Sequence, residues 1–281
     1  MRQRFTFGSA LNLLFLLALC VTMILPFLNV LSLSLSSGVA SMEPGIHLFP
    51  ASFSFQGYTV LFEKLSLWQP ISISLFVAGT GTLLHVLLSA LAAYALMQPG
   101  LPGRRVLLVF ILVTTLAPTE AMLVPLYILM QQLGLINSLM SLILSGLGSA
   151  FSILIIRGYG FLLAGELFEA ARLDGAGDWQ IFARLFLPMA RPALLVVVIF
   201  EFVGKWNMFT EPLLYINSPN LYPLQLALQS LVSNTESTSA GTYVAENAQM
   251  AGVVIGVLPL VCLYPFVQRR LFEGISFGGM K

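Results

Sequence analysis

Charged side chains are scarce in this chain. Only 9% of its 281 residues are Asp, Glu, Lys or Arg, while 58% are hydrophobic. Soluble domains usually carry about 25% charged residues, so this composition argues against a water-soluble fold. The formal net charge is +1, and no basic excess or long run of like charge points to nucleic acid as a partner.

Residues that carry out chemistry are also few. The two cysteines, Cys20 and Cys262, both lie in apolar segments, which excludes a disulfide framework and a metal site of the usual spacing. There are two histidines and no Gly-x-Ser-x-Gly or His-Glu-x-x-His motif, so a membrane enzyme is disfavoured. A Gly-x-x-x-x-Gly-Lys-Ser/Thr loop is missing too, so we expect no ATP bound through a P-loop and no cofactor on this chain.

What the chain has instead is long apolar stretches. A membrane-spanning helix needs about 20 apolar residues, and its backbone groups must be satisfied within the segment. Six stretches qualify: 11–32, 70–97, 106–131, 139–160, 193–215 and 249–267. The first is longer than the core of a signal peptide, so we expect it to be retained. The sequence therefore predicts an all-α integral membrane protein with six transmembrane helices in one domain, 1–281.

The positive charges lie on alternate connecting segments. Only Lys64 lies in a segment assigned to the outside. The segments assigned to the inside hold Arg2, Arg4, Arg104, Arg105, Arg172, Arg184, Arg191, Arg269, Arg270 and Lys281. Positive residues concentrate on the cytoplasmic side of membrane proteins, so both termini are predicted to be cytoplasmic.

Ionisable residues occur inside several predicted spans: His85, Glu120, Glu201 and Lys205. Each costs about 2.5–3.5 kcal/mol in a membrane if unpaired, so they must face protein or water. Glu201 and Lys205 are four residues apart and either neutralise each other on one helix face or line a polar pathway. His85 is interpreted as a packing histidine rather than a proton carrier.

Prolines predict where two of the spans are interrupted. Pro118 and Pro125 flank Glu120, and Pro212 lies near the end of the fifth span, so both helices are expected to kink or break. Broken helices at that depth are where transporters bind substrate. The candidate substrate-pathway residues are Glu120, Glu201, Lys205, Trp206 and Asn207.

Small residues four apart predict close helix packing in two other spans. The pairs are Ser89 with Ala93 in the second span, and Ser145 with Ser149 and Gly146 with Ala150 in the fourth.

The cytoplasmic segment 161–191 carries the most specific pattern. Apolar residues at helical spacing predict a short helix over 167–173, which Asp174-Gly175 ends. A second helix is predicted over 179–187 before Pro188, and Pro192 suits the first turn of the next span. Gly175 is expected to have a positive φ in the turn between the two helices.

The run Glu169-Ala170-Ala171, followed by Asp174-Gly175-Ala176 and a later proline, resembles the EAA motif of ABC importer permeases. In that family the short helix docks into a cleft on the cytoplasmic ATPase subunit. The resemblance therefore implies an ATPase-coupling loop formed by Glu169, Ala170, Ala171, Asp174, Gly175, Ala176, Phe182 and Pro188.

Other segments are similar to the carbohydrate branch of this family, the maltose-permease MalG type. They are 54–58, 92–96, 103–104, 205–207, 212–214 and the C-terminal 273–281, whose counterpart in the maltose system reaches the ATPase. The resemblance implies a type I permease fold in the bacterial cytoplasmic (inner) membrane and a carbohydrate substrate, with an oligosaccharide as the expected kind. The implied partners are a second homologous permease, a dimer of P-loop ATPase subunits holding ATP and Mg, and an extracytoplasmic solute-binding protein.

An ion-coupled secondary transporter is the alternative function. It would use the four intramembrane ionisable residues as relay groups. Such carriers generally work as one chain with more spans and internal repeats, whereas a six-span chain with an inward docking loop needs partners.

The orientation is tested by cysteine accessibility. We expect a cysteine at Ser54 to react with an impermeant thiol reagent from outside the cell, and a cysteine at Gly177 to react only after the inner face is exposed. Labelling of the Gly177 position from outside would contradict the cytoplasmic assignment of both termini.

Overall fold

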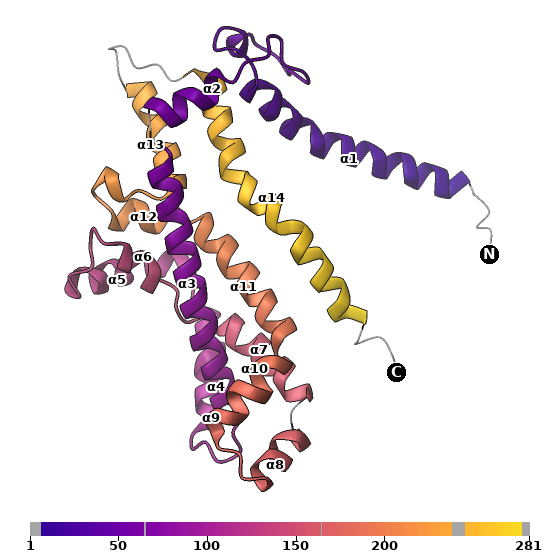
Figure 1. Ribbon diagram of the computed structural model, residues 1–281, viewed down its shortest axis with the longest axis vertical. Coiled ribbons are helices and arrows are strands. Elements are labelled where there is room, and N and C mark those ends of the chain that lie inside the picture. The colour runs from indigo at the N-terminus through magenta and orange to yellow at the C-terminus, as the bar shows by residue number, and fades with distance from the viewer. Residues whose placement is uncertain (1–6, 65, 164, 238–244, 277–281) are drawn as a thin grey trace. The chain divides into compact units, whose positions relative to one another are not determined.

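A computed structural model describes residues 7–64, 66–163, 165–237 and 245–276 (Figure 1). The regular elements in this part of the chain are all helices, and one isolated antiparallel bridge joins Ser36 and Phe53. It forms two compact units, the first of Met1–Trp68 and Ala227–Pro259 and the second of Gln69–Leu226 and Leu260–Lys281. The last five residues of the C-terminal segment that resembles the maltose permease tail, 277–281, lie outside the described residues.

The first unit contains the N-terminal segment of the chain and part of its C-terminal third. Its elements are α1 (Phe7–Ser34), a 3₁₀ turn (Ala40–Met42), α2 (Gln56–Thr59) with a π-helical continuation (Val60–Lys64), most of α13 (Leu224–Ser237) and the start of α14 (Glu246–Ser276). The buried Asn247 joins α14 to the loop after α1: its Nδ2 donates to Ser36 O at 3.0 Å, and its backbone N–H donates to Ser41 Oγ at 3.2 Å.

The second unit contains the remaining helices. They are α3 (Trp68–Ala95), α4 (Arg104–Thr114), α5 (Thr119–Gln132), α6 (Leu139–Leu144), α7 (Ala150–Leu163), α8 (Gly165–Leu173), α9 (Asp178–Ile181) with a π-helical continuation (Phe182–Phe186), α10 (Leu187–Met189), α11 (Arg191–Trp206) and α12 (Thr210–Tyr215). Within this unit α3, α7 and α11 run alongside one another, and α8 and α9 lie at one end (Figure 1).

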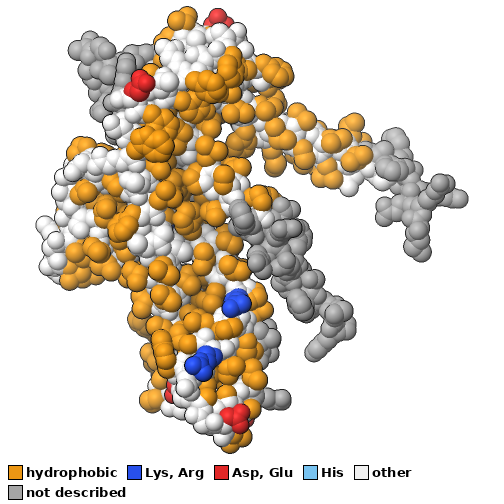
Figure 2. Space-filling view, in the orientation of Figure 1, with side chains coloured by type: hydrophobic (Ala, Val, Ile, Leu, Met, Phe, Trp, Pro, Cys, Tyr) orange, Lys and Arg blue, Asp and Glu red, His pale blue; other side chains and the backbone are white. Residues whose placement is uncertain are grey.

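Helix α3 has the side-chain distribution of a membrane helix. Its buried face includes Ser74, Thr82, His85 and Ser89, while leucines such as Leu83 are exposed. A soluble helix would bury the apolar face and expose the polar one. Figure 2 shows apolar side chains over much of the visible surface. The predicted close-packing positions Ser89 and Ala93 are both buried.

Three described helices are long and apolar enough to cross a membrane: Leu11–Ser34, Trp68–Ala95 and Glu246–Pro265. They match the predicted spans 11–32, 70–97 and 249–267. A fourth crossing is possible by length and composition if the bent pair Asp178–Met189 and Arg191–Trp206, which meet at 76°, counts as one.

The other three predicted spans are each interrupted. The stretch 106–131 divides between α4 and α5, and the stretch 193–215 divides between α11 and α12. Both breaks were expected from Pro118 and Pro212, which lie at or just after them. The break between α6 and α7 was not predicted, because no proline marks it.

The prediction that 139–160 is one continuous helix is therefore wrong. Residues 145–149 are not helical, and Gly146 has φ +75°. The pairs Ser145 with Ser149 and Gly146 with Ala150 cannot act as small residues four apart on one helix face, because the helix stops between their members. Their smallness serves an irregular backbone instead.

Gly57 in α2 is required by close backbone approach in the first unit. A Cβ at this position would lie 2.7 Å from the backbone oxygen of Asn247. We therefore expect Gly57→Ala to force the start of α14 away and to cost about 1–3 kcal/mol, the usual range for overpacking. The thermal unfolding midpoint in detergent should fall by a few degrees. Gly8→Ala in α1 is the matched control, since no atom lies within 4 Å of its added Cβ; equal midpoints for both variants would contradict this packing.

Candidate functional site

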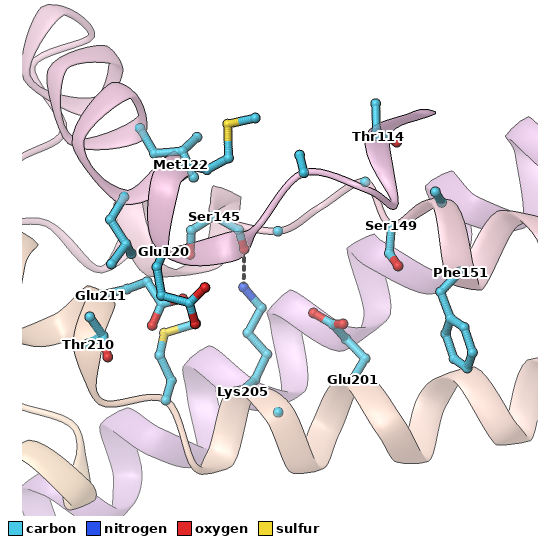
Figure 3. A pocket seen from close by; sticks show the side chains of 18 of the residues that line it. Thr114, Glu120, Met122, Ser145, Ser149, Phe151, Glu201, Lys205, Thr210 and Glu211 are labelled. Atoms are coloured by element: carbon cyan, nitrogen blue, oxygen red, sulfur yellow. Dashed lines mark hydrogen bonds between the residues drawn. The ribbon is translucent and has the colours of Figure 1, made fainter. Parts of the chain in front are cut away.

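The three helix breaks line one cavity in the second unit. Its volume is about 830 Å³, and Figure 3 shows polar side chains from different elements pointing into it. The lining residues include Thr114, Thr115, Ala117 and Glu120 from the first break, Ser145, Gly146, Gly148 and Ser149 from the second, and Lys205, Met208, Thr210 and Glu211 from the third. Segments that are far apart in the sequence thus meet at one cavity, which has polar side chains within a largely apolar lining.

Lys205 lies beside the C-terminal end of α6. Its side chain is only 6% exposed. Its Nζ donates to the backbone oxygens of Leu142 (2.8 Å), Ile143 (3.5 Å) and Ser145, and Figure 3 shows it directed at the break. The last carbonyls of a helix have no partner within the helix and form the negative end of its dipole, so an ammonium is favourable there.

His85 holds the same break from α3. The ring is fully buried, and Nδ1 must donate to Gly146 O at 2.8 Å because a carbonyl only accepts. Nε2 lies 2.9 Å from Ser152 Oγ in the first turn of α7, and Glu201 Oε2 lies 3.5 Å from Nδ1. The interpretation of His85 as a packing histidine is confirmed by these contacts.

Glu201 and Lys205 therefore have different nearest partners. Glu201 faces His85, while Lys205 faces backbone carbonyls. Both still line the cavity, together with Glu120, as expected for candidate pathway residues. Their place in the cavity wall agrees with lining, one of the two ideas that the sequence left open, and their role in transport stays a prediction.

The other two candidate pathway residues, Trp206 and Asn207, do not line the cavity. Trp206 is 1% exposed and stacks on Phe202 with ring centroids 6.3 Å apart. Asn207 is exposed but donates from Nδ2 to Val203 O at 3.0 Å, and neither residue lines the cavity. The sequence reasoning instead missed Glu211, whose position as a further ionisable residue within an apolar stretch could have revealed it.

The loop 161–191 has the predicted helix-turn-helix form. Gly175 has φ +83°, as expected. Its N–H donates to Arg172 O at 3.0 Å and that of Ala176 donates to Ala171 O at 2.9 Å, which is the Schellman arrangement that ends a helix. Glu169, Ala170 and Asp174 are exposed around this turn.

An aromatic cluster holds the loop against α3. Tyr94, Phe168, Phe182 and Phe186 are all buried, with ring centroids of neighbouring pairs 5.4–6.4 Å apart. Tyr94 Oη also donates to Asp178 O at 3.1 Å. Phe182 is thus an internal support of the loop rather than part of its surface, and Pro188 is half-buried at the end of the same segment.

Neither region has the composition of a metal centre. Over the described ranges, no three His, Cys, Asp or Glu side chains are grouped so that they could hold a metal ion. The cavity and the loop therefore provide hydrogen bonds, charge and surface shape.

Comparison with known proteins assigns the family. Residues 85–276, more than half of the chain, match the model of the binding-protein-dependent transport system inner membrane component. The chain belongs to this family, and its resemblance to ABC importer permeases is confirmed. The matched residues include the loop, His85, Lys205 and all the cavity-lining residues.

Two curated relatives extend along nearly the whole chain. The polygalacturonan/rhamnogalacturonan transport system permease protein YtcP of Bacillus subtilis (strain 168) is 29% identical over 95% of this chain and 96% of its own. The diacetylchitobiose uptake system permease protein NgcG of Streptomyces coelicolor is 30% identical over 97% of this chain and 89% of its own.

A solved structure has the same fold. It is the crystal structure of a bacterial ABC transporter involved in the import of the acidic polysaccharide alginate, with a TM-score of 0.87, 24% identity, and coverage of 95% of this chain and 99% of the other. The family is one of transport components, in agreement with the expectation that the chain is not an enzyme. Nothing in these matches supports the ion-coupled alternative.

Proposed function

We propose that this chain forms half of the translocation pathway of an ATP-driven importer for a carbohydrate, most simply an oligosaccharide. The observation that carries the proposal is the convergence of three helix breaks on one cavity that contains hydroxyl and charged side chains. Irregular backbone at membrane depth is tolerated only where it is buried in protein or lines a water-filled cavity, and transporters place substrate at such discontinuous helices.

The chemistry of the cavity suits a sugar. Hydroxyl groups of Thr114, Thr115, Ser149 and Thr210 line it beside carboxylates, so hydroxyl-rich ligands find both donors and acceptors. Its volume of about 830 Å³ lies in the range of small-molecule sites. The relatives named for polygalacturonan, rhamnogalacturonan and diacetylchitobiose transport support the carbohydrate class.

The proposed topology has six spans, with both termini in the cytoplasm of a bacterial cell. In this arrangement α1, α3 and α14 each cross the membrane, and the pairs α4–α5, α6–α7 and α11–α12 are broken spans. The family description as an inner membrane component supports the location. The 281 residues then form a single transmembrane permease domain that spans the membrane several times.

The segment from α8 to α10 is the proposed docking element for the cytoplasmic ATPase. Two large apolar side chains flank its turn, Leu173 at 89% exposed and Trp179 at 69% exposed. Exposed apolar groups beside Glu169 and Ala170 form a surface that a partner can cover. The cavity supplies the sugar route, while ATP and Mg are held by the partner ATPase dimer.

The complete importer is proposed to contain this chain, a second homologous permease, two P-loop ATPase subunits and an extracytoplasmic sugar-binding protein. Its test is reconstitution of the purified complex in liposomes. We expect sugar uptake that requires both ATP and the binding protein. Uptake driven by a proton gradient through this chain alone would contradict the proposal.

The docking element is tested by a matched pair of glycine variants. Gly175→Val places a β-branched residue at φ +83°, whereas Gly177→Val places the same residue at φ −73°, where valine fits. A side chain in the left-handed region costs about 1–2 kcal/mol, enough to reduce the docked population about tenfold. We expect uptake to fall with Gly175→Val at normal membrane levels, and to persist with Gly177→Val.

Reversal of the charge at Glu169 is a second test of the same surface. Glu169 is exposed on α8, so Glu169→Lys should leave the fold intact while opposing a partner surface complementary to the acid. The expected result is loss of uptake and loss of ATP hydrolysis stimulated by the loaded binding protein. Parental values in both assays would remove the region from the docking surface.

A further inference from the structure

The irregular backbone between α6 and α7 is held by side chains from two other helices. Lys205 of α11 donates to backbone carbonyls at the end of α6. His85 of α3 contacts Gly146 O and Ser152 Oγ on the two sides of the break. The break has no regular secondary structure of its own between Ser145 and Ser149. Its shape, and hence one wall of the cavity, depends on these tertiary contacts.

The ammonium group of Lys205 matches the carbonyl oxygens at the end of α6. An ammonium has three donors, and Nζ lies within hydrogen-bond reach of three carbonyl oxygens. The stem of the side chain passes Gly81 of α3, where an added Cβ would lie 3.2 Å from Lys205 Cε. A glycine at 81 and a lysine at 205 therefore fit each other, and a larger residue at 81 would crowd the lysine stem.

Two of the helices that meet at the break, α7 and α11, also flank the cytoplasmic loop. Helix α7 leads from the break to α8, and α11 leads from α10 back to Lys205. They pack along each other, with Phe151 of α7 and Phe200 of α11 in an edge-to-face contact at 5.8 Å. The cytoplasmic loop is thus joined to α11, and Lys205 at the other end of α11 contacts the Ser145–Ser149 wall of the cavity.

We propose that Lys205 is a positioning residue for transport: it fixes the end of α6 to α11, so that displacement of the cytoplasmic loop reshapes the Ser145–Ser149 wall of the cavity. Release of the contact would separate the ammonium from three carbonyl oxygens at the end of α6, of which Leu142 O also accepts from Ser145 Oγ, and would cost the free energy of these hydrogen bonds. The α6 terminus therefore moves with α11. This inference rests on the proposed function as an ATP-driven importer.

A role in stability alone makes a different prediction. If Lys205 only supports the fold, its loss lowers the amount of assembled complex and reduces uptake and ATP hydrolysis together. If Lys205 connects the loop to the cavity, its loss leaves ATP hydrolysis in place and lowers the number of sugar molecules imported per ATP. The ratio of the two rates separates these outcomes.

The experiment compares Lys205→Met and Lys205→Arg in the complete reconstituted complex. We expect Lys205→Met to assemble and hydrolyse ATP while the imported sugar per ATP falls about tenfold, within the range over which single residues alter coupling. Lys205→Arg keeps the charge and the donors and should recover most of the ratio. Leu195→Met, at an exposed position of α11 outside the cavity, is the control and should match the parent.

A second variant covers the case in which Lys205→Met fails to assemble. Gly81→Ala leaves Lys205 in place but crowds its Cε, so the ratio should fall in the same direction and by less. Gly79→Ala on the same helix has no atom within 4 Å of its added Cβ and should have no effect.

The outcomes separate the inference from the proposed function. A parental ratio in Lys205→Met, or in Gly81→Ala where Lys205→Met does not assemble, would overturn the role of Lys205. Parallel losses of uptake and ATP hydrolysis that Lys205→Arg does not recover would overturn it as well. A parent complex without ATP-dependent uptake would instead overturn the proposed function, and this inference with it.

Discussion

Backbone carbonyls exposed by an interrupted helix must find donors where water is scarce, and this requirement shapes the second unit. Lys205 meets it at the end of α6, and His85 meets it within the break. Asn137 acts in the complementary sense beyond α12, where its Oδ1 accepts from the N–H groups of Asn217 (3.0 Å) and Ser218 (2.9 Å). Polar side chains thus stabilise irregular backbone at these three places, which gives them a structural role in an apolar protein.

The two ends of this unit are stabilised by different interactions. Around the breaks, hydrogen bonds to the backbone decide the structure. At the loop, where the helices are short but regular, the aromatic cluster of Tyr94, Phe168, Phe182 and Phe186 holds them by apolar packing. A loop fixed from within in this way can present its outer residues as a firm surface. In the proposed mechanism, movement of that surface would pass to α11, which follows directly after α10.

Local signals predicted much of this architecture. Apolar length gave α1, α3 and α14, proline indicated two of the breaks, and Asp174-Gly175 predicted the turn at φ +83°. The break after Ser145 was missed because its cause is not local: Gly146 permits the irregular backbone, but Lys205 and His85, distant in sequence, stabilise it. Trp206 and Asn207 stand outside the cavity for different reasons. Trp206 is still within α11 and packs on Phe202, whereas Asn207 lies just beyond the helix end, where helical spacing from Lys205 no longer predicts which way a side chain points.

The contacts of Lys205 also bear on which charges a ligand would meet. A lysine in a sugar pathway invites the interpretation that it binds acidic groups. Here its donors are directed to Leu142, Ile143 and Ser145, and the cavity wall of this chain presents the carboxylates of Glu120, Glu201 and Glu211 with several hydroxyls. A negatively charged group close to these carboxylates would be repelled, so in the proposed pathway this wall favours a neutral sugar over an anionic one.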